Sequence, residues 1–270
     1  MAALGLDQAR IVCGDGVEYL RQMGPVDFIY LDPARRDEHG SRTYAIEDCT
    51  PNVFELRDLL LVKSQYTLVK LSPMLDWRKA VADFDGAVRE VHIVATGNEC
   101  KELLLVLGQQ VHEEPSAPRV FCVNDNQRID YDSAAYTQGL RIGDKPLPEA
   151  KKNYLYEPNA SIMKAGCFDL VEERFGVTQV GPSSHLFVSA TPVADFPGRG
   201  FAIEAIGGMN KKDIKRLLNG TKQANIAVRN FPLTAPQLRK KLKLADGGPV
   251  YLFGTTMQGC DHVLLRTSKI

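Results

Sequence analysis

The feature that most constrains the fold is the stretch of residues 26–36, a continuous apolar run that stops at Asp32 and Pro33. An apolar run without alternation is typical of a strand buried on both faces of a parallel sheet. The acid then lies at the carboxyl end of its strand, the edge where open α/β sheets bind ligands. Because Pro33 fixes φ and lacks an N–H, it would hold the turn that aims the Asp32 carboxylate. A plain strand followed by an Asp-Pro turn is the alternative interpretation.

The segments after this run alternate between helical and extended patterns, which predicts an α/β sheet that closes near Gly108. Lys70 and Ser72 stand near the end of the second strand and are expected to flank the same crevice as Asp32. The pattern predicts helices over residues 17–23, 51–62 and 77–84, and strands over residues 66–73, 88–95 and 101–107.

Composition places the chain among globular proteins of one to three domains, with 270 residues, 44% of them hydrophobic and 24% charged. The six cysteines form no Cys-x-x-Cys, so neither a zinc site nor a disulfide framework is indicated, and no metal is expected. No apolar run approaches about 18 residues and the start lacks a signal pattern. We therefore expect a cytoplasmic protein with no membrane partner.

The residues Asp32-Pro33-Ala34-Arg35 resemble the Asp-Pro-Pro-x motif that ends the fourth strand in class I S-adenosylmethionine-dependent methyltransferases, particularly those acting on nucleobases. The resemblance implies a Rossmann-like sheet in which Asp32 accepts a hydrogen bond from the target base while the backbone of Pro33 and Ala34 shapes the pocket. Two positions depart from the motif: Ala34 replaces the second proline, and Arg35 replaces the aromatic residue that often stacks on the base.

Residues 9–16 resemble the preceding strand of that fold, whose terminal acid faces the cofactor adenine. Asp15, flanked by Gly14 and Gly16, would take this role. The glycine-rich loop and the ribose-binding acid of the family should precede residue 9, and neither is present, so the methyltransferase sheet is expected to be N-terminally incomplete. We expect S-adenosylmethionine to bind this chain weakly or not at all.

The end of the second strand also bears on the chemistry of transfer. Residues 70–76 lack the nucleophilic cysteine that C5-pyrimidine methyltransferases carry near this position, which favours transfer to nitrogen or oxygen, where no covalent adduct is needed. The polar segment 35–52 leaves the Asp32 strand end, where substrate contacts concentrate. Arg35 and Arg36 are expected to hold the RNA backbone there, and a solvated loop is the alternative.

Residues 113–118 mark a change of composition and a domain boundary. Beyond it the pattern predicts a hairpin around residues 124–126, a helix over 160–175 and a strand over 186–189, a module that resembles a small ferredoxin-like domain. The last part has strands over 201–206, 224–228, 250–253 and 262–266 with helices over 210–218 and 234–244. We therefore expect a partial methyltransferase domain at 1–112, a ferredoxin-like linker module at 113–197 and an RNA-binding domain at 198–270.

The formal net charge is zero, but the charge is unevenly distributed. Residues 199–270 hold 13 Lys and Arg against 4 Asp and Glu, a surplus of +9 that hints at a polyanionic partner. Basic side chains gather on the last two helices, and a merely solvated face is the alternative for each. They are Lys211, Lys212, Lys215 and Arg216 on the first helix and Arg239, Lys240, Lys241 and Lys243 on the second.

Residues 222–233, with 238–242 and 251–253, resemble the C-terminal THUMP-like domain of a bacterial family of class I methyltransferases. Three segments agree in order: Asp-Pro-Ala-Arg-Arg, Tyr-Leu-Tyr-Glu-Pro-Asn and Arg-Asn-Phe-Pro. THUMP domains bind tRNA, so the resemblance implies an RNA substrate. Arg229, Asn230 and Phe231 are the contacts expected first, a guanidinium and a ring able to meet phosphate and base; a strand end and turn is the alternative.

Two functions follow from these observations. The first is a methyltransferase that modifies a base of structured RNA by transfer to nitrogen, with tRNA as the expected substrate. The second is a catalytically inactive or truncated RNA-binding relative, which the missing cofactor loop favours. A hydrolytic or metal enzyme is not indicated, because the sequence contains neither a His-x-x-x-His nor a Gly-x-Ser-x-Gly motif.

Overall fold

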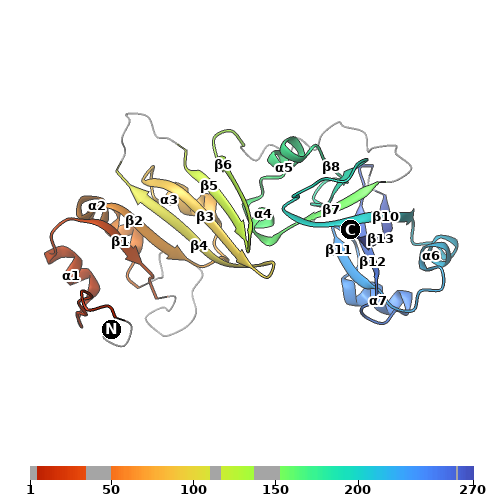
Figure 1. Ribbon diagram of the computed structural model, residues 1–270, viewed down its shortest axis with the longest axis horizontal. Coiled ribbons are helices and arrows are strands. Elements are labelled where there is room, and N and C mark those ends of the chain that lie inside the picture. Colours follow the sequence, from red (N-terminus) through yellow and green to blue (C-terminus); the bar gives the residue numbers. More distant parts are fainter. Residues whose placement is uncertain (1–4, 35–49, 110–116, 137–152, 260) are drawn as a thin grey trace. The chain divides into compact units, whose positions relative to one another are not determined.

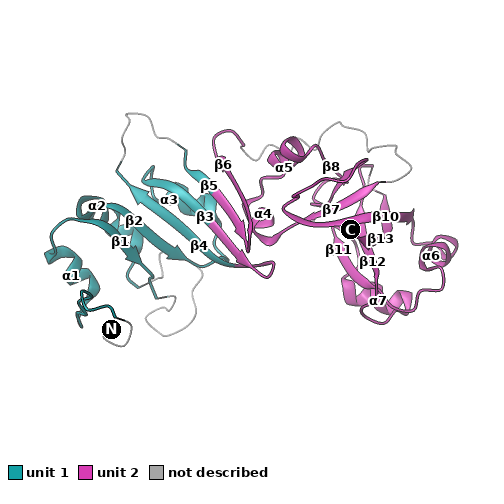
Figure 2. Cartoon of the chain, in the orientation of Figure 1, with its two compact units in different colours: residues 1–92, 101–120 teal, residues 93–100, 121–270 magenta. Residues whose placement is uncertain are grey.

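The computed structural model describes residues 5–34, 50–109, 117–136, 153–259 and 261–270. The chain forms two compact units, which Figure 2 shows in different colours. The first unit comprises residues 1–92 and 101–120, and the second comprises residues 93–100 and 121–270. Within the described ranges, no helix is both long and apolar enough to span a membrane.

The N-terminal part of the chain builds a six-stranded sheet with the order β1-β2-β4-β3-β5-β6 (Figure 1). β1 and β2 are parallel, with Ile29 opposite Thr67, whereas β4 is antiparallel to β2. The strands are β1 (Val26–Leu31), β2 (Ser64–Leu71), β3 (Val88–Thr96), β4 (Glu99–Gly108), β5 (Arg119–Asn124) and β6 (Gln127–Asp132). The helices are α1 (Gly16–Gln22), α2 (Val53–Lys63) and α3 (Trp77–Asp83), so strands and helices alternate as predicted up to β3. The prediction that the sheet closes near Gly108 is wrong, because β5 and β6 pair beside β3 and extend the same sheet to Asp132.

The core lies on one face of the central strands β2, β3 and β4, where burial alternates along most of each strand. Thr67, Val69 and Leu71 of β2 pair with three leucines of β4 and are almost fully buried. α2 packs against β2. The buried residues on this face also include Val91, Ile93 and Ala95 of β3 and Leu103, Leu105 and Leu107 of β4.

The prediction that the strand over residues 26–31 is buried on both faces is wrong. β1 is the edge of the sheet, with β2 as its single neighbour among the described strands. Phe28 and Tyr30 are 54% and 55% exposed, and across from Phe28 lies Tyr66, also exposed. An apolar run therefore does not by itself predict a buried strand. Burial on both faces also requires a second neighbouring strand and a covering layer on each face.

The strand expected over residues 9–16 does not form, and residues 9–13 have no regular structure. A strand is held by hydrogen bonds to a neighbouring strand, and the described part of the chain offers none to this segment, so Ile11 is 72% exposed. The helix that follows is confirmed: α1 begins at Gly16, where the Asp15 side chain caps it.

The C-terminal part of the chain builds a seven-stranded sheet with the order β11-β12-β13-β10-β7-β9-β8. β11 and β12 are parallel, and the other neighbouring pairs of this sheet are antiparallel. Phe201 and Phe253 meet in its core with ring centroids 4.9 Å apart. The strands are β7 (Tyr154–Pro158), β8 (Thr178–Gln179), β9 (Phe187–Ser189), β10 (Gly198–Gly207), β11 (Asn225–Arg229), β12 (Val250–Thr256) and β13 (His262–Lys269), and the helices are α4 (Ala160–Ala165), α5 (Phe168–Phe175), α6 (Lys211–Leu218) and α7 (Ala235–Leu242).

The hairpin predicted around residues 124–126 forms as β5 and β6, which belong to the six-stranded sheet. Most predicted elements of the C-terminal part are confirmed, including the capping box of Thr234 and Gln237 at the start of α7. Two differ. The single helix expected over residues 160–175 is two helices, because Gly166 takes a left-handed φ of 65° and ends α4. Residues 154–158 form strand β7, which the sequence pattern did not predict.

Candidate functional site

The first candidate site is the end of β1, where the structure brings Asp32 and Lys70 together. Asp32 follows the last residue of β1, and Lys70 lies near the end of the parallel strand β2. Lys70 Nζ donates to Asp32 Oδ2 at 2.9 Å and lies 3.8 Å from Glu102 Oε1 of β4. The hydrogen bond to Asp32 raises the pKa of Lys70, burial opposes the rise, and the charge of Glu102 adds to it. Lys70 therefore stays protonated and partly neutralises two carboxylates.

The Asp32 carboxylate remains accessible, since its side chain is 42% exposed. Oδ2 accepts the Lys70 proton, and within the described ranges no hydrogen bond reaches Oδ1. This pair can accept a hydrogen bond from a ligand while Lys70 holds the carboxylate in place. The crevice edge expected from the sequence thus has its acid and its lysine in contact.

The residues near Asp32 have structural roles. Ala34 and Thr50 form an antiparallel bridge. Ala34 N donates to Thr50 O at 2.9 Å, and Thr50 N donates to Ala34 O at 3.1 Å. Pro33 is buried. Ser72 is also buried, and its hydroxyl accepts a hydrogen bond from Met74 N at 3.3 Å, which makes it part of a turn. Arg35 and Arg36 lie outside the described residues.

The residues expected to hold the cofactor do not form a cradle for it. Asp15 Oδ1 accepts a hydrogen bond from Glu18 N at 2.8 Å as the cap of α1, and the side chain lies on the surface. A Cβ added at Gly14 or Gly16 would meet no atom within 4 Å, so neither glycine lines a tight cavity. Asp15, Gly14 and Gly16 therefore do not by themselves form a binding site for S-adenosylmethionine. Among them, no group of three or more His, Cys, Asp or Glu side chains is placed to bind a metal ion.

An open cavity of about 620 Å³ lies at the other end of the same strands. Asp32 follows the carboxyl end of β1, whereas this cavity is lined from the amino ends of β1 and β2, so the two are separate. Its lining residues are Pro25, Val26, Val62, Ser64, Gln65, Tyr66, Arg89, Glu90, Gln109 and Arg119.

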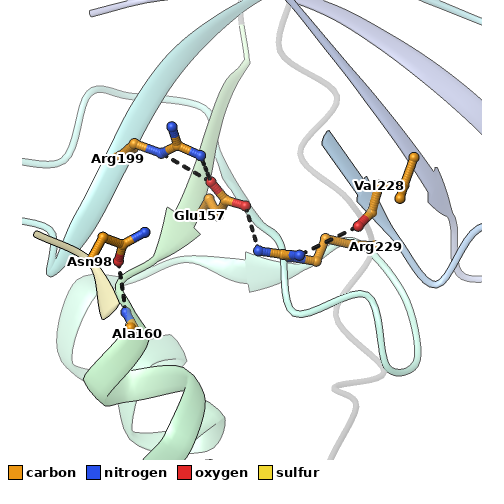
Figure 3. Close-up of polar contacts among 6 residues, drawn as sticks. All are labelled: Asn98, Glu157, Ala160, Arg199, Val228 and Arg229. Carbon is orange, nitrogen blue, oxygen red and sulfur yellow. Dashed lines mark hydrogen bonds and ion pairs between the residues drawn. The ribbon is translucent and has the colours of Figure 1, made fainter. Parts of the chain in front are cut away.

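The second candidate site is a buried carboxylate held by two arginines in the C-terminal sheet (Figure 3). Glu157 of β7 is 3% exposed, and Arg199 lies directly opposite it on β10. Arg199 Nε donates to Glu157 Oε2 at 3.1 Å, and its Nη2 forms a short contact with the same oxygen. Arg229 Nη2, from the end of β11, donates to Oε1 at 2.9 Å. Both carboxylate oxygens are therefore paired with guanidinium groups.

This contact requires a strongly curved sheet. Three strands separate β11 from β7, so in a flat sheet the two would lie about 19 Å apart at about 4.8 Å per strand. An arginine side chain cannot span that distance, so the twist of the sheet brings Arg229 toward Glu157. The same unit carries the turn of Asn98, whose Oδ1 accepts the Ala160 N–H at 2.8 Å at the start of α4 (Figure 3).

His185 lies near enough to Arg229 for the arginine charge to act on it. Its ring stacks on Phe168 with centroids 4.2 Å apart, and its backbone has a φ of 50°. Burial lowers the pKa of His185, and the positive charge of Arg229 lowers it further. Among the described residues, its buried Nδ1 has no hydrogen-bond partner. The imidazole is therefore neutral at pH 7 beside a cationic pair.

The three residues expected to contact RNA first have different surroundings. Arg229 is tied to Glu157, as described above. Asn230 takes a φ of 47°, and its Nδ2 donates to Pro182 O at 2.7 Å. The ring of Phe231 packs on the backbone of Gly254, where an added Cβ would lie 3.0 Å from it, and it belongs to the apolar core. Phe231 is thus a packing residue of the turn.

The two basic helices present most of their cations to solvent. Lys211, Lys212 and Lys215 of α6 are exposed, and so are Lys240 and Lys241 of α7. Arg239 differs, because its Nη1 donates to the carbonyls of Ala224 and Ala245 at 2.9 and 3.0 Å. Arg239 therefore holds the loop before β11 in place.

Sequence reasoning missed Glu157, Arg199, His185 and a buried pair of cysteines. Cys122 and Cys167 lie side by side, and the hydrogen bond between them, followed by burial, raises the pKa of Cys122. Glu157 carried a usable signal, since an acid inside the apolar run of residues 154–158 must find a partner if the run is buried.

Comparison with known proteins gives three findings. Residues 154–197 match the model of a ferredoxin-like domain, and residues 198–269 match that of a THUMP domain-like family. The chain is similar to the crystal structure of a "putative methyltransferase from Porphyromonas gingivalis W83", with 35% identity and a TM-score of 0.81. The match covers 95% of this chain and 63% of that protein, so the chain spans less than two thirds of its relative. No curated protein matches.

Proposed function

We propose that this chain, a relative of the Porphyromonas gingivalis protein with ferredoxin-like and THUMP-like domains at its C-terminal end, acts in S-adenosylmethionine-dependent methylation of a base in structured RNA. The proposed substrate is tRNA and the proposed acceptor is a nitrogen atom. In this proposal residues 1–112 belong to the methyltransferase domain, residues 113–197 form the ferredoxin-like linker module and residues 198–270 dock the RNA.

One observation carries the RNA part of the proposal. The THUMP-like segment holds a surplus of +9, and the lysines of α6 and α7 are exposed, so their charge is free to meet phosphate. Neutralising backbone phosphates releases counterions and supplies most of the affinity of such surfaces. Lys240 and Lys241 are the contacts proposed on α7, and Lys211, Lys212 and Lys215 those on α6.

The Asp32–Lys70 pair supports the catalytic part. In the proposal Asp32 accepts a hydrogen bond from an amino group or ring nitrogen of the target base, and Lys70 keeps the carboxylate oriented. Positioning of this kind supplies a large share of the rate in a bimolecular transfer. The methyl group comes from the cofactor, and the residues of this chain hold the acceptor.

A second candidate function, RNA binding without catalysis, is favoured by the surroundings of Asp15, Gly14 and Gly16. These three residues lie on the surface and do not enclose a cofactor. On this interpretation the chain docks RNA and the Asp32–Lys70 pair is a surface ion pair.

The two functions are separated by measuring RNA affinity and methyl transfer on the same preparation. Gel shifts with tRNA at rising salt report docking, and incorporation of labelled methyl groups into undermethylated total RNA reports catalysis. We expect tRNA binding that weakens steeply with salt. Binding without incorporation selects the second function, and the absence of binding at 50 mM salt rejects both.

A further inference from the structure

The cluster of Glu157, Arg199, Arg229 and His185, here called the arginine cluster, holds more positive charge than its own structure requires. One buried carboxylate is compensated by one guanidinium, and this cluster supplies two. His185 is neutral at pH 7 because burial and Arg229 lower its pKa. The formal charge of the cluster is therefore +1.

Donors remain on both guanidinium groups. Glu157 engages Arg199 through Nε and Nη2, which leaves Nη1, and it engages Arg229 through Nη2. Nη1 of Arg229 makes only a long contact of 3.5 Å with Val228 O. The side chains of Arg199 and Arg229 are 44% and 39% exposed, so a ligand in solvent can reach these donors.

Buried polar atoms also lie beside the cluster. Arg229 Nε and Thr255 Oγ1 are buried, and neither has a hydrogen-bond partner among the described residues. Thr255 is fully buried, and it is the register partner of Arg229 in the parallel pair of β11 and β12, so the two side chains share a face. Buried polar atoms in folded proteins are nearly always paired, so these two show that the hydrogen bonding around Arg229 is incomplete. A ligand in solvent would reach the exposed donors of the two guanidinium groups and not these buried atoms.

We propose that the arginine cluster binds the phosphates of the RNA backbone, with Glu157 lying between the two guanidinium groups and fixing each of them so that it keeps free N–H donors for a phosphate. The planar fork of a guanidinium matches two phosphate oxygens at once. Glu157 of β7 lies directly opposite Arg199 of β10, so the Arg199 guanidinium is held on the sheet. Arg229, at the end of β11, binds the other oxygen of the same carboxylate. The inference rests on the proposed RNA docking and adds a specific, preorganised contact to the diffuse charge of α6 and α7.

The test measures binding of the full chain to a fluorescent tRNA by anisotropy across salt concentrations. R199Q and R229Q each remove one fork, and R174Q serves as the control, since Arg174 is an exposed arginine of the same unit that donates to Asp130 O instead. Each cluster variant is expected to bind about five- to tenfold more weakly. The plot of log K against log salt has a negative slope, and each variant should make that slope less steep by about 0.7 to 0.9, the value for one phosphate contact. R174Q should stay within twofold of the wild type.

Thermal melting identifies variants that lose their fold. If R229Q melts early, the double variant E157Q/R229Q removes both members of the pair and leaves no unpaired buried charge. It should fold and still show the weakened binding and the smaller slope. Wild-type binding by folded cluster variants would overturn the phosphate site and leave RNA docking intact, whereas a wild-type chain that binds no RNA would overturn both.

A second arm distinguishes the source of the phosphate. Inorganic phosphate is titrated into wild type and R199Q at constant ionic strength, while the imidazole signals of His185 are followed by NMR. A site for RNA phosphate requires that R199Q weakens tRNA binding. A shift of His185 by free phosphate, together with unchanged tRNA affinity in R199Q, would instead assign the cluster to a small anion and overturn the proposal.

Discussion

Arg266 of β13 holds the basic helix α6 on the sheet, and its replacement tests how that surface is built. Its Nη1 donates to the carbonyls of Leu217 and Leu218, the last two residues of α6, at 2.9 and 3.0 Å. The same atom donates to Thr221 Oγ1 at 2.9 Å, and Nε pairs with Glu204 at 2.7 Å. The side chain is only 17% exposed. A cation at this position also complements the negative end of the helix dipole.

The cost of R266M follows from these contacts. Nη1 has two hydrogens for these three acceptors, so the contacts count as about two hydrogen bonds from a charged donor. At about 1.5 kcal/mol each they give about 3 kcal/mol. The helix-end charge adds about 0.5 kcal/mol. For a unit of this size a loss of about 3.5 kcal/mol lowers the melting temperature by roughly 7 to 14 °C. E204Q is the matched control, because it removes only the ion-pair partner, which is 40% exposed, and should cost under about 1 kcal/mol.

The measurement is hydrogen exchange of the full chain, since a chain with two units need not unfold in one transition. In R266M the amides of α6 should exchange faster by about two orders of magnitude, the factor that corresponds to about 3 kcal/mol, and tRNA affinity should fall with them. In E204Q the exchange of α6 should stay near the wild-type rate. Equal protection of α6 in the two variants would refute the reasoning, because the carbonyl contacts would then contribute nothing.

Three further predictions follow. D32N should leave the free energy of unfolding within about 1 kcal/mol of wild type, since the Asp32–Lys70 pair is exposed, and should leave tRNA affinity unchanged while abolishing any methyl incorporation; a loss of affinity would show that Asp32 belongs to the docking surface. G198A should destabilise the protein by about 3 kcal/mol in urea unfolding, because its Cβ would lie 2.1 Å from the carbonyl oxygen of Glu157 and must force β7 and β10 apart; wild-type stability would contradict this close approach. Because burial and then Arg229 lower the pKa of His185, the unfolded state takes up a proton that the folded state refuses, so stability should fall as pH drops through about 6.5; H185Q should flatten that part of the pH profile, and an unchanged profile would mean that His185 does not contribute.

Local signals in the sequence predicted the helices well. Thr234 and Gln237 form the expected capping box, and α1, α2 and α3 lie where the apolar spacing places them. These features depend on residues within a few positions of one another, and that is the range over which propensity and capping act. Gly166 is also a local signal, but the prediction of one continuous helix from periodicity did not use it. Its left-handed conformation ends α4.

Features set by distant neighbours could not be predicted in the same way. The run of residues 26–31 has the composition of a central strand, yet its burial depends on which strands and helices lie beside it. The same limit applies to the arginine cluster, in which Arg199 and Arg229 lie 42 and 72 residues along the chain from Glu157. Only the curvature of the C-terminal sheet brings Arg229 to β7, and nothing in the spacing of these residues encodes that approach.

The exposure of the Asp32–Lys70 pair decides how it can contribute to catalysis. Lys70 lies in the half-exposed row of β2 with Tyr66 and Leu68, on the face opposite the core. A hydrogen bond from a ligand to Asp32 is worth little while water competes for the same oxygen, and it strengthens only where water is excluded. The pair can therefore orient a base only after something covers this face. Since RNA docking brings the base itself, we expect methyl incorporation to require the exposed lysines of α6 and α7 even though they touch none of the reacting atoms.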